Sequence, residues 1–258
     1  MAKARVKGLI KLISGLMVGF FSVFPALAHI DHSSKPQGDS EIAHSGQWSG
    51  VLEAGLISTS GNSQSEVFNS AVKAVREWDR WTQTVNMTTA GASFNGTRNT
   101  ESYLLDGTVK FDLSEQQFLF VNARYFDDKF DSFSESVSAA GGAGFKPVLN
   151  QTFSWDVFTG IGYSHQLLEQ SGEDISGVTF LGISRYSRKL TDSTNLDFNT
   201  TVEYKPENTF SRNEASLDVA INSTLALKLA YEIRYNSEPA RVDKNLDTIT
   251  KANIVYRF

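Results

Sequence analysis

The sequence predicts an all-β protein: a closed antiparallel transmembrane β-barrel of about 12 strands arranged as an up-and-down meander. Three features predict this fold class: segments in which apolar and polar residues alternate, turns whose lengths also alternate, and a secretory-type segment that precedes them. Alternation places successive side chains on opposite faces of a strand, and a membrane barrel turns its apolar face toward lipid. The hydrophobic fraction of 40% and the mean hydropathy of -0.25 fit such a barrel, because only every second strand residue contacts lipid.

Residues 1–28 are expected to be a cleaved secretory signal. Basic residues at positions 3, 5, 7 and 11 precede an apolar stretch from Leu12 to Phe24. Ala26 and Ala28 then provide the small residues that signal peptidase requires, with cleavage after Ala28. A transmembrane anchor is the alternative, but the stretch is shorter than the roughly 20 residues of a spanning helix. Residues 29–46 lack periodicity and are expected to form a flexible periplasmic tail.

The composition narrows the classes of partner. The chain contains no Cys, which excludes a lipoprotein anchor and disulfides. Loss of the signal removes four bases and no acids, taking the formal charge from -5 to -9. Such acidity argues against nucleic acid as a partner.

Residues 47–258 are predicted to form the barrel. The alternating segments number twelve, an even number as expected for a bacterial single-chain barrel with both ends in the periplasm. They cover approximately residues 47–59, 65–78, 80–94, 101–113, 117–127, 136–146, 151–166, 177–190, 195–205, 213–222, 225–235 and 247–258.

The clearest alternation lies in the last third of the chain, in the segments 195–205 and 225–235. The final segment also alternates and ends on Tyr256 and Phe258. A terminal aromatic residue is typical of bacterial outer-membrane barrels, whose assembly machinery reads the last strand. We therefore expect Tyr256 and Phe258 to be an assembly signal.

The segment 177–190 is the least regular. Leu181 and Ile183 are out of phase with Val178, Phe180 and Tyr186. A β-bulge or a different register would explain this irregularity.

Turn lengths and aromatic residues predict the orientation. Links after even-numbered strands are short and several links after odd-numbered strands are longer, as expected for periplasmic turns and external loops. With this threading the four Trp residues fall at the periplasmic ends of strands and five Tyr residues fall at the external ends, as in the two aromatic girdles of a membrane barrel. They are Trp48, Trp78, Trp81 and Trp155, and Tyr103, Tyr125, Tyr163, Tyr204 and Tyr235.

A soluble β-sandwich or a soluble lipid-binding barrel is the rival fold. Those folds also alternate, but they bury their apolar face. Here the opposite face carries many charges, and the strands reach the roughly 9 to 11 residues of a membrane-spanning strand, which favours the membrane barrel.

Several short motifs occur in a characteristic order along the mature chain. The chain resembles, on these motifs, the salt-induced outer-membrane protein family, a β-barrel domain family of unknown function. The resemblance implies a closed outer-membrane barrel and brings no established reaction, ligand or catalytic residue; Phe145 stands where the family pattern has Tyr. The motifs are Trp48 with its following glycines, Ser60-Gly61-Asn62, residues Tyr125 to Phe130, Gly141-Gly142-Ala143-Gly144-Phe145, Gly160-Ile161-Gly162-Tyr163 and Val255-Tyr256-Arg257-Phe258.

The face opposite the apolar one is expected to line a crowded, nearly neutral lumen. Asp218 is expected near Lys228 and Glu214 near Arg234, because the turn at residues 222–225 pairs their strands. Glu232 and Lys251 share this face. Leaving out the irregular eighth strand, we count ten acids (Glu53, Glu77, Asp106, Asp112, Asp156, Asp197, Glu203, Glu214, Asp218, Glu232) and nine bases (Lys73, Lys110, Arg124, Lys146, Lys205, Lys228, Arg234, Lys251, Arg257).

No catalytic, cofactor-binding or metal site is predicted. His165 is the one His of the predicted barrel, and its neighbours along the strand on the same face are Tyr163 and Leu167, while Ser164 points the other way, so a Ser-His catalytic pair is not expected.

Other candidate sites are weak. His29 and His32 lie in the tail, where no structure would fix metal ligands or a pairing of His32 with Ser34. The external acids Asp127, Asp128, Asp131 and Glu135 lack the spacing of a calcium loop, and the glycines of residues 139–144 precede no helix that could hold phosphate. We expect those glycines to permit strand curvature.

The sequence thus predicts a non-enzymatic barrel of the bacterial outer membrane, a narrow passive channel or a structural, stress-related envelope protein. A lipid-active enzyme and an adhesion or receptor barrel are the alternatives. The expected partners are outer-membrane lipid, lipopolysaccharide and the barrel assembly machinery, and the oligomeric state stays open.

Overall fold

The computed structural model describes residues 46–59, 65–95, 97–128, 133–150, 152–168, 174–206, 208–237 and 245–258. The expected signal peptide, its cleavage after Ala28 and residues 29–45 of the expected tail lie outside these residues. Residues 46–258 form one compact unit. No helix in the described part of the chain is long and apolar enough to cross a membrane.

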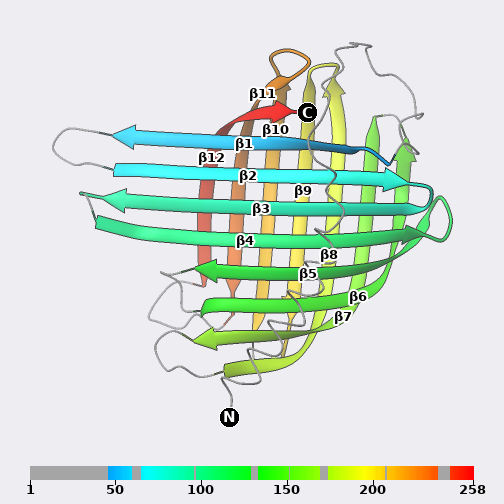
Figure 1. The fold of residues 1–258 in the computed structure, drawn as a ribbon, viewed down its shortest axis with the longest axis horizontal. Coiled ribbons are helices and arrows are strands. Elements are labelled where there is room, and N and C mark those ends of the chain that lie inside the picture. Colours follow the sequence, from blue (N-terminus) through cyan, green and yellow to red (C-terminus); the bar gives the residue numbers. More distant parts are fainter. Residues whose placement is uncertain are drawn as a thin grey trace. The chain divides into compact units, whose positions relative to one another are not determined.

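Twelve antiparallel strands close into one barrel in sequence order, which confirms the predicted meander (Figure 1). Strands β1–β7 cross the front of the barrel in Figure 1, and β9–β12 run steeply behind them. The strands are β1 (Trp48–Thr59), β2 (Ser65–Trp78), β3 (Trp81–Phe94), β4 (Thr97–Asp112), β5 (Gln117–Asp128), β6 (Phe133–Asn150), β7 (Phe153–Leu168), β8 (Asp174–Thr191), β9 (Thr194–Tyr204), β10 (Thr209–Ala220), β11 (Leu225–Asn236) and β12 (Leu246–Arg257).

The first and last strands close the barrel. The register of β1 with β12 runs from Val51 opposite Arg257 to Ala54 opposite Ile254. Beyond it, Gly50 and Phe258 exchange two backbone hydrogen bonds of 2.9 and 3.0 Å. Closure satisfies the backbone groups of these positions, as a spanning sheet needs in lipid, whereas among the described residues β12 offers no register partner to residues 55–59 of β1.

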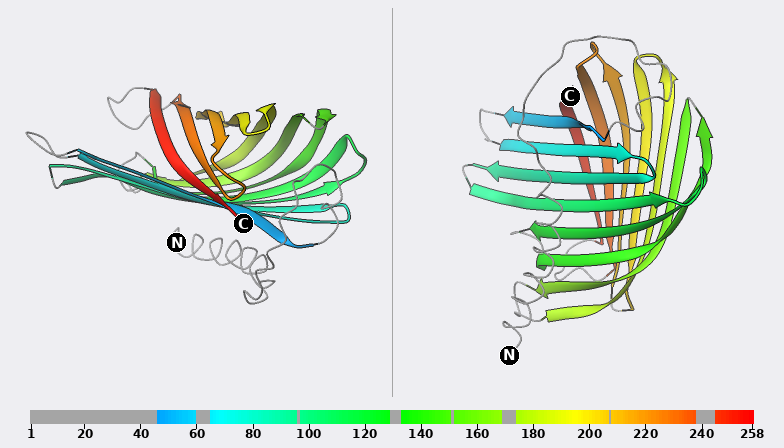
Figure 2. Two further views of the ribbon diagram at one scale, coloured as in Figure 1. Left: turned by 90° about the horizontal axis from the view of Figure 1, so that it is seen from above. Right: turned by 45° about the vertical axis from the view of Figure 1, so that its right-hand side comes forward.

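Glycines lie where β6 and β7 bend strongly from one side of the barrel to the other (Figures 1 and 2). Gly142 of β6 stands opposite Gly160 of β7, and a Cβ atom at Gly142 would lie 2.1 Å from the carbonyl oxygen of Thr159. Only a residue without a side chain fits such a close approach. The glycines therefore permit the close approach of β6 and β7, and their expected role in strand curvature stays a prediction.

The eighth strand, β8, whose apolar pattern is irregular, keeps a continuous register with both neighbouring strands at Leu181 and Ile183. Ile183 pairs with Phe158 of β7 and with Thr201 of β9, and the register shifts only near the strand end, between Lys189 and Thr191. Neither a bulge at Leu181 nor a slipped strand is present. Leu181 and Ile183 instead face the lumen, while Phe180 is 52% exposed on the outer face.

The Trp and Tyr residues lie toward opposite ends of the strands, but not all of them lie at strand ends: Tyr103 is six residues inside β4 and Tyr163 is five residues before the end of β7. Trp48 begins β1, and Trp78 and Trp81 flank the β2–β3 turn with their rings stacked at 6.4 Å. At the opposite end Tyr204 closes β9 and Tyr235 lies one residue before the end of β11.

Candidate functional site

The lumen-facing side of the strands carries the polar and charged groups. On β11, Lys228, Glu232 and Arg234 face inward, whereas Leu229 and Tyr231 between them face outward with 49% and 47% of their surface exposed. The inward parity continues from strand to strand through the registers, so the candidate site is the lumen itself.

Glu232 is the centre of the largest ion-pair network. Its side chain is fully buried, and it accepts hydrogen bonds from Arg212 at 2.9 Å, from Arg234 at 2.5 Å and from Lys251. Lys251 also contacts Glu214 at 2.9 Å. A buried carboxylate requires such a set of donors, since burial of an unpaired charge is costly.

The network continues toward β1, and here the partners differ in part from those that the strand pairing suggested. Asp218 does stand opposite Lys228 in the β10–β11 register. The ammonium group of Lys228, however, lies 3.0 Å from Glu53 and 3.8 Å from Glu214. Glu214 stands opposite Glu232 and pairs with Lys251, so within the described residues its partners do not include Arg234.

Two further ion pairs span the lumen. Arg124 of β5 donates a hydrogen bond to Glu203 of β9, four strands away, and Lys110 of β4 contacts Asp156 of β7 at 3.0 Å. Arg124 also lies 3.6 Å from Asp106. Side chains from separated walls thus meet across the interior and narrow it.

Two lumen bases were absent from the sequence-based count. Arg212 was assigned to a loop, but β10 begins at Thr209, which brings Arg212 to Glu232. Arg185 lies on the eighth strand, whose faces alternation alone did not separate; its guanidinium lies 4.9 Å from the ring centre of Phe158. The bases on the inward face rise from nine to eleven against ten acids, so the balance stays close to neutral.

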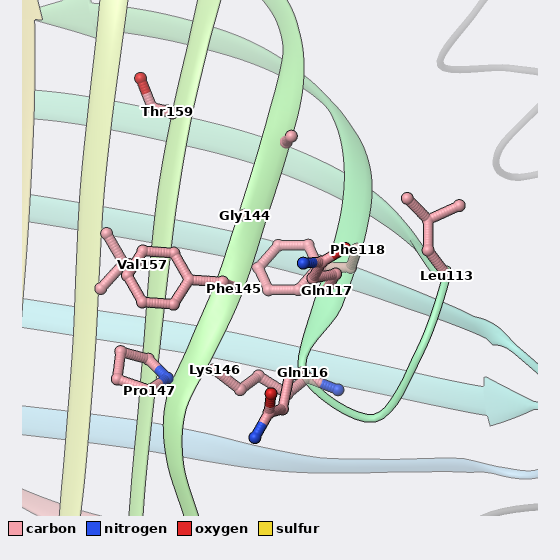
Figure 3. Close-up of a pocket in the computed structure, with 11 residues that line it drawn as sticks. Leu113, Gln116, Gln117, Phe118, Gly144, Phe145, Lys146, Pro147, Val157 and Thr159 are labelled. Atoms are coloured by element: carbon pink, nitrogen blue, oxygen red, sulfur yellow. The ribbon is translucent and has the colours of Figure 1, made fainter.

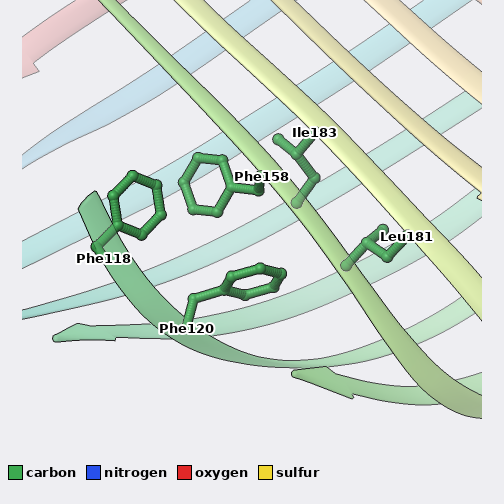
Figure 4. Close-up of a cluster of buried hydrophobic side chains, with 5 residues drawn as sticks. All are labelled: Phe118, Phe120, Phe158, Leu181 and Ile183. Carbon is green, nitrogen blue, oxygen red and sulfur yellow. The ribbon is translucent and has the colours of Figure 1, made fainter. Parts of the chain in front are cut away.

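An apolar cluster also faces the lumen (Figure 4). Phe118 and Phe120 of β5 contact Phe158 of β7 edge to face, with ring centres 4.8 and 5.2 Å apart, and Leu181 and Ile183 complete the cluster. The signal was present in the sequence, since Phe118 and Phe120 share parity with Arg124. The cluster fills the space above the bare glycines, with the Phe118 ring over Gly144 and the Phe120 ring over Gly160.

His165 has a serine neighbour that inspection along its own strand missed. Ser176 of β8 stands opposite His165 in the register, and its hydroxyl lies 2.7 Å from Nδ1 of His165. Both residues have outward parity near the end of the barrel where Tyr204 lies. A Ser-His contact is one component of a hydrolytic site, which further requires an orienting acid and an oxyanion hole.

The other candidate sites do not bring together side chains that could bind a metal ion or catalyse a reaction, within the part of the chain that the structure describes. Asp127 and Glu135 face each other across β5 and β6, but Asp131 lies outside the described residues, and the described residues contain no group of three or more metal-ligating side chains. A groove of about 440 Å³ lies beside the β4–β5 turn (Figure 3). Its charged side chain, Lys146, is paired with Asp112 at 3.1 Å. The groove is lined by Leu113, Gln116, Gln117, Phe118, Ala143, Gly144, Phe145, Lys146, Pro147, Val157 and Thr159.

The expected assembly signal lies at the closing seam. The rings of Tyr256 and Phe258 stack with centres 6.4 Å apart, and both side chains are exposed on the outside of the barrel. Phe258 also covers Gly50 of β1. Both rings therefore lie on the outer surface of the closed barrel, and their role as an assembly signal stays a prediction.

Comparisons with known proteins identify a family and a relative of this chain. The family model described as "Protein of unknown function, DUF481" matches residues 52–258. The "Uncharacterized protein YdiY" of Escherichia coli (strain K12) is 26% identical over 242 residues, covering 90% of this chain and 91% of the relative.

Solved structures with a similar fold are outer-membrane barrels. The COG4313 outer membrane channel from Pseudomonas putida F1 superposes with a TM-score of 0.53 at 11% identity, covering 86% of this chain and all of that one. The NanC porin gives a TM-score of 0.50 at 10% identity, covering 80% and 98%. At these identities the likeness shows the fold alone.

Proposed function

This chain belongs to the DUF481 family of proteins of unknown function, and we propose that it is a narrow, non-enzymatic passive channel of the bacterial outer membrane. The observation that carries the proposal is a charged lumen that ion pairs narrow and in which some inward-facing side chains are still exposed to water. Arg124 and Glu203 meet across it, while Lys73 and Asn199, which also face inward, are exposed to solvent.

The size of the barrel supports the same function. Barrels of roughly 8 strands fill their interior with side chains, and those of 16 to 18 strands leave a water channel. Twelve strands lie between, and the lumen here is partly occupied by the ion pairs and by the cluster around Phe158. Passage of small solutes past paired side chains is the expected result.

The structural neighbours support the location and the class. Both neighbours above are named as an outer membrane channel or a porin. Outer-membrane lipid, lipopolysaccharide and the barrel assembly machinery are the partners that such a location implies. The salt-induced character suggested by the family resemblance stays a prediction, as does a purely structural role in the envelope.

Solute entry into liposomes tests the channel. Refolded protein in liposomes is exposed to neutral solutes of increasing size, and the rate of swelling is recorded. A narrow channel admits only the smallest solutes. Rapid entry of large oligosaccharides, or no entry of any solute, contradicts the proposal.

A lipid-active enzyme is the second candidate, favoured by one contact. The hydroxyl of Ser176 lies 2.7 Å from His165 on the lipid-facing side. A phospholipase assay of the refolded wild type and of Ser176→Ala separates the two functions. Hydrolysis that depends on Ser176 supports the enzyme, and its absence supports the non-enzymatic channel.

A further inference from the structure

Most Lys and Arg side chains that face the lumen form ion pairs with carboxylates. A few of them do not, and these are the basis of the inference below. Lys205 contacts the amide oxygen of Gln166 at 2.5 Å, and within the described part of the barrel Lys73, Arg185 and Arg257 are inward-facing bases with no carboxylate within 4 Å. Arg257 lies at the end of the last strand. Lys73 and Arg185 lie inside the barrel, on β2 and β8.

Lys73 extends into lumen water. Its register partners are Val51 of β1 and Asn86 of β3, so no acid stands directly opposite it on either neighbouring strand. Its side chain is exposed although it has inward parity. Asn199 of β9 is likewise inward and exposed, so the water reaches both walls.

Charged groups from the opposite wall lie within electrostatic reach of Lys73. They include Arg185 of β8 and Asp197 of β9, together with Glu53 and Lys228 nearer to its own wall. Strands β2 and β8 are six positions apart in either direction around the barrel, so this reach extends across the full width of the lumen. The lumen is therefore narrow at Lys73.

Arg185 packs against an aromatic ring and forms no ion pair with a carboxylate of the described residues. It stands opposite Asp156 in the β7–β8 register, but the carboxylate of Asp156 lies 3.0 Å from Lys110. The guanidinium packs instead over the Phe158 ring at 4.9 Å. Asp106 and Arg124 are the other charged groups that act on it.

Two acids at the same place also lack a basic partner. No Lys or Arg of the described residues lies within 4 Å of Asp197 or Asp218. These two acids are diagonal neighbours, because Asp218 stands opposite Asn195, two residues before Asp197 on the same face of β9. Lys228, opposite Asp218, is drawn to Glu53, which Asn253 also contacts at 3.1 Å. Lys73 and Arg185 thus have no acidic ion-pair partner within 4 Å, and Asp197 and Asp218 have no basic one.

We propose that Lys73 and Arg185, with Asp197 and Asp218, form a dipolar constriction that favours small zwitterionic solutes such as free amino acids. A solute carboxylate contacts the two bases while its ammonium group contacts the two acids. This inference rests on the proposed channel and names the class of solute that it prefers.

Separated charges of both signs select dipoles over simple ions. A monovalent ion is attracted by one pair and repelled by the other, so its net gain is small. A zwitterion gains from both contacts at once. In a narrow lumen with low-dielectric walls these interactions are stronger than in bulk water.

Alanine and lactamide provide the test, because they are isomers of equal size and only alanine is zwitterionic. Entry of each solute into liposomes is compared for the wild type, Lys73→Gln and Asp197→Asn. The wild type is expected to admit alanine about threefold faster than lactamide, in line with the modest strength of water-screened charge contacts. Both variants are expected to bring the ratio close to one, and Arg257→Gln, the matched control, to leave it unchanged.

The outcomes separate this inference from the channel itself. Equal entry of both solutes into wild-type liposomes overturns the zwitterion preference and leaves the channel standing. Entry of neither overturns the channel, and equilibrium dialysis of radiolabelled alanine against detergent-solubilised protein then decides the inference. Binding that Lys73→Gln abolishes supports a zwitterion site, and no binding overturns it.

Discussion

Arg124 of β5 donates a hydrogen bond to Glu203 of β9 across the barrel interior. The two side chains are 20% and 13% exposed, so water still reaches both. The pair ties together strands that are four positions apart and obstructs the lumen without sealing it.

Removal of this tie is expected to widen the channel. Replacing both partners, as in Arg124→Ala with Glu203→Ala, removes bulk and both charges of the pair. Asp106 loses a basic neighbour at 3.6 Å but keeps the hydrogen bonds that Asn86 and Asn122 donate to it. Single-channel conductance is expected to rise relative to the wild type. The control is Lys189→Ala with Asp192→Ala, an exposed pair at the β8–β9 turn with a separation of 2.9 Å, which is expected to leave conductance unchanged.

Glu232 is expected to be the most important lumen acid for stability. Glu232→Gln leaves Arg212, Arg234 and Lys251 without their shared anion, and removing one partner of a buried network costs about 3 kcal/mol. We place the cost at this lower bound because the bases are 17–29% exposed. Urea unfolding in lipid vesicles measures it, with Glu77→Gln at an exposed position as the control. Equal stability of the two variants would show that the network does not hold the barrel together.

A charge on the outer face is expected to destabilise the barrel in lipid. Leu229→Lys, near the middle of β11, should lower the free energy of unfolding by about 2 to 4 kcal/mol. Ser187→Lys, on the inward side of β8 and opposite Asp197 in the β8–β9 register, is the matched control and should cost little. The assignment of the two faces is wrong if both substitutions cost the same.

The bend of β6 gives a prediction about backbone packing. Gly142→Ala would place a Cβ atom 2.1 Å from a backbone oxygen of β7, whereas a Cβ atom at Gly107 of β4 meets nothing within 4 Å. We expect Gly142→Ala to destabilise by about 1 to 3 kcal/mol, as overpacked sites do. Gly107→Ala should be close to neutral in the same unfolding assay, and a neutral Gly142→Ala would contradict the close approach.

Deletion of Phe258 is expected to impair assembly in cells more than folding in detergent. The deletion removes two backbone hydrogen bonds with Gly50, a small part of the strand ladder, but it also removes the terminal aromatic residue. Membrane levels in cells and refolding yield in detergent micelles measure the two effects. Normal membrane levels of the truncated protein would argue against an assembly signal.

Strand order and face assignment followed from alternation, but side-chain partners did not. Alternation predicts that Lys228 faces inward. The short turn between β10 and β11 predicts that Asp218 stands opposite it. It does not fix that Lys228 turns to Glu53 of β1, because the β1–β12 closure brings together residues 175 positions apart.

Alternation did not predict the apolar cluster in the lumen, for a different reason. Leu181 and Ile183 looked irregular because strand patterns assume one apolar face, and here both faces of β8 carry apolar residues. Arg212 was missed because strand ends are set by pairing with neighbours, and β10 extends as far as its pairing with β9 allows.

Single-channel conductance of the wild-type protein in a planar bilayer tests the central claim most directly. A lumen of twelve strands, crossed by Arg124–Glu203 and Lys110–Asp156 and nearly neutral in charge, predicts small or unresolved conductance steps with weak ion preference. A conductance like that of a large general porin, or a strong preference for anions or cations, would contradict the account.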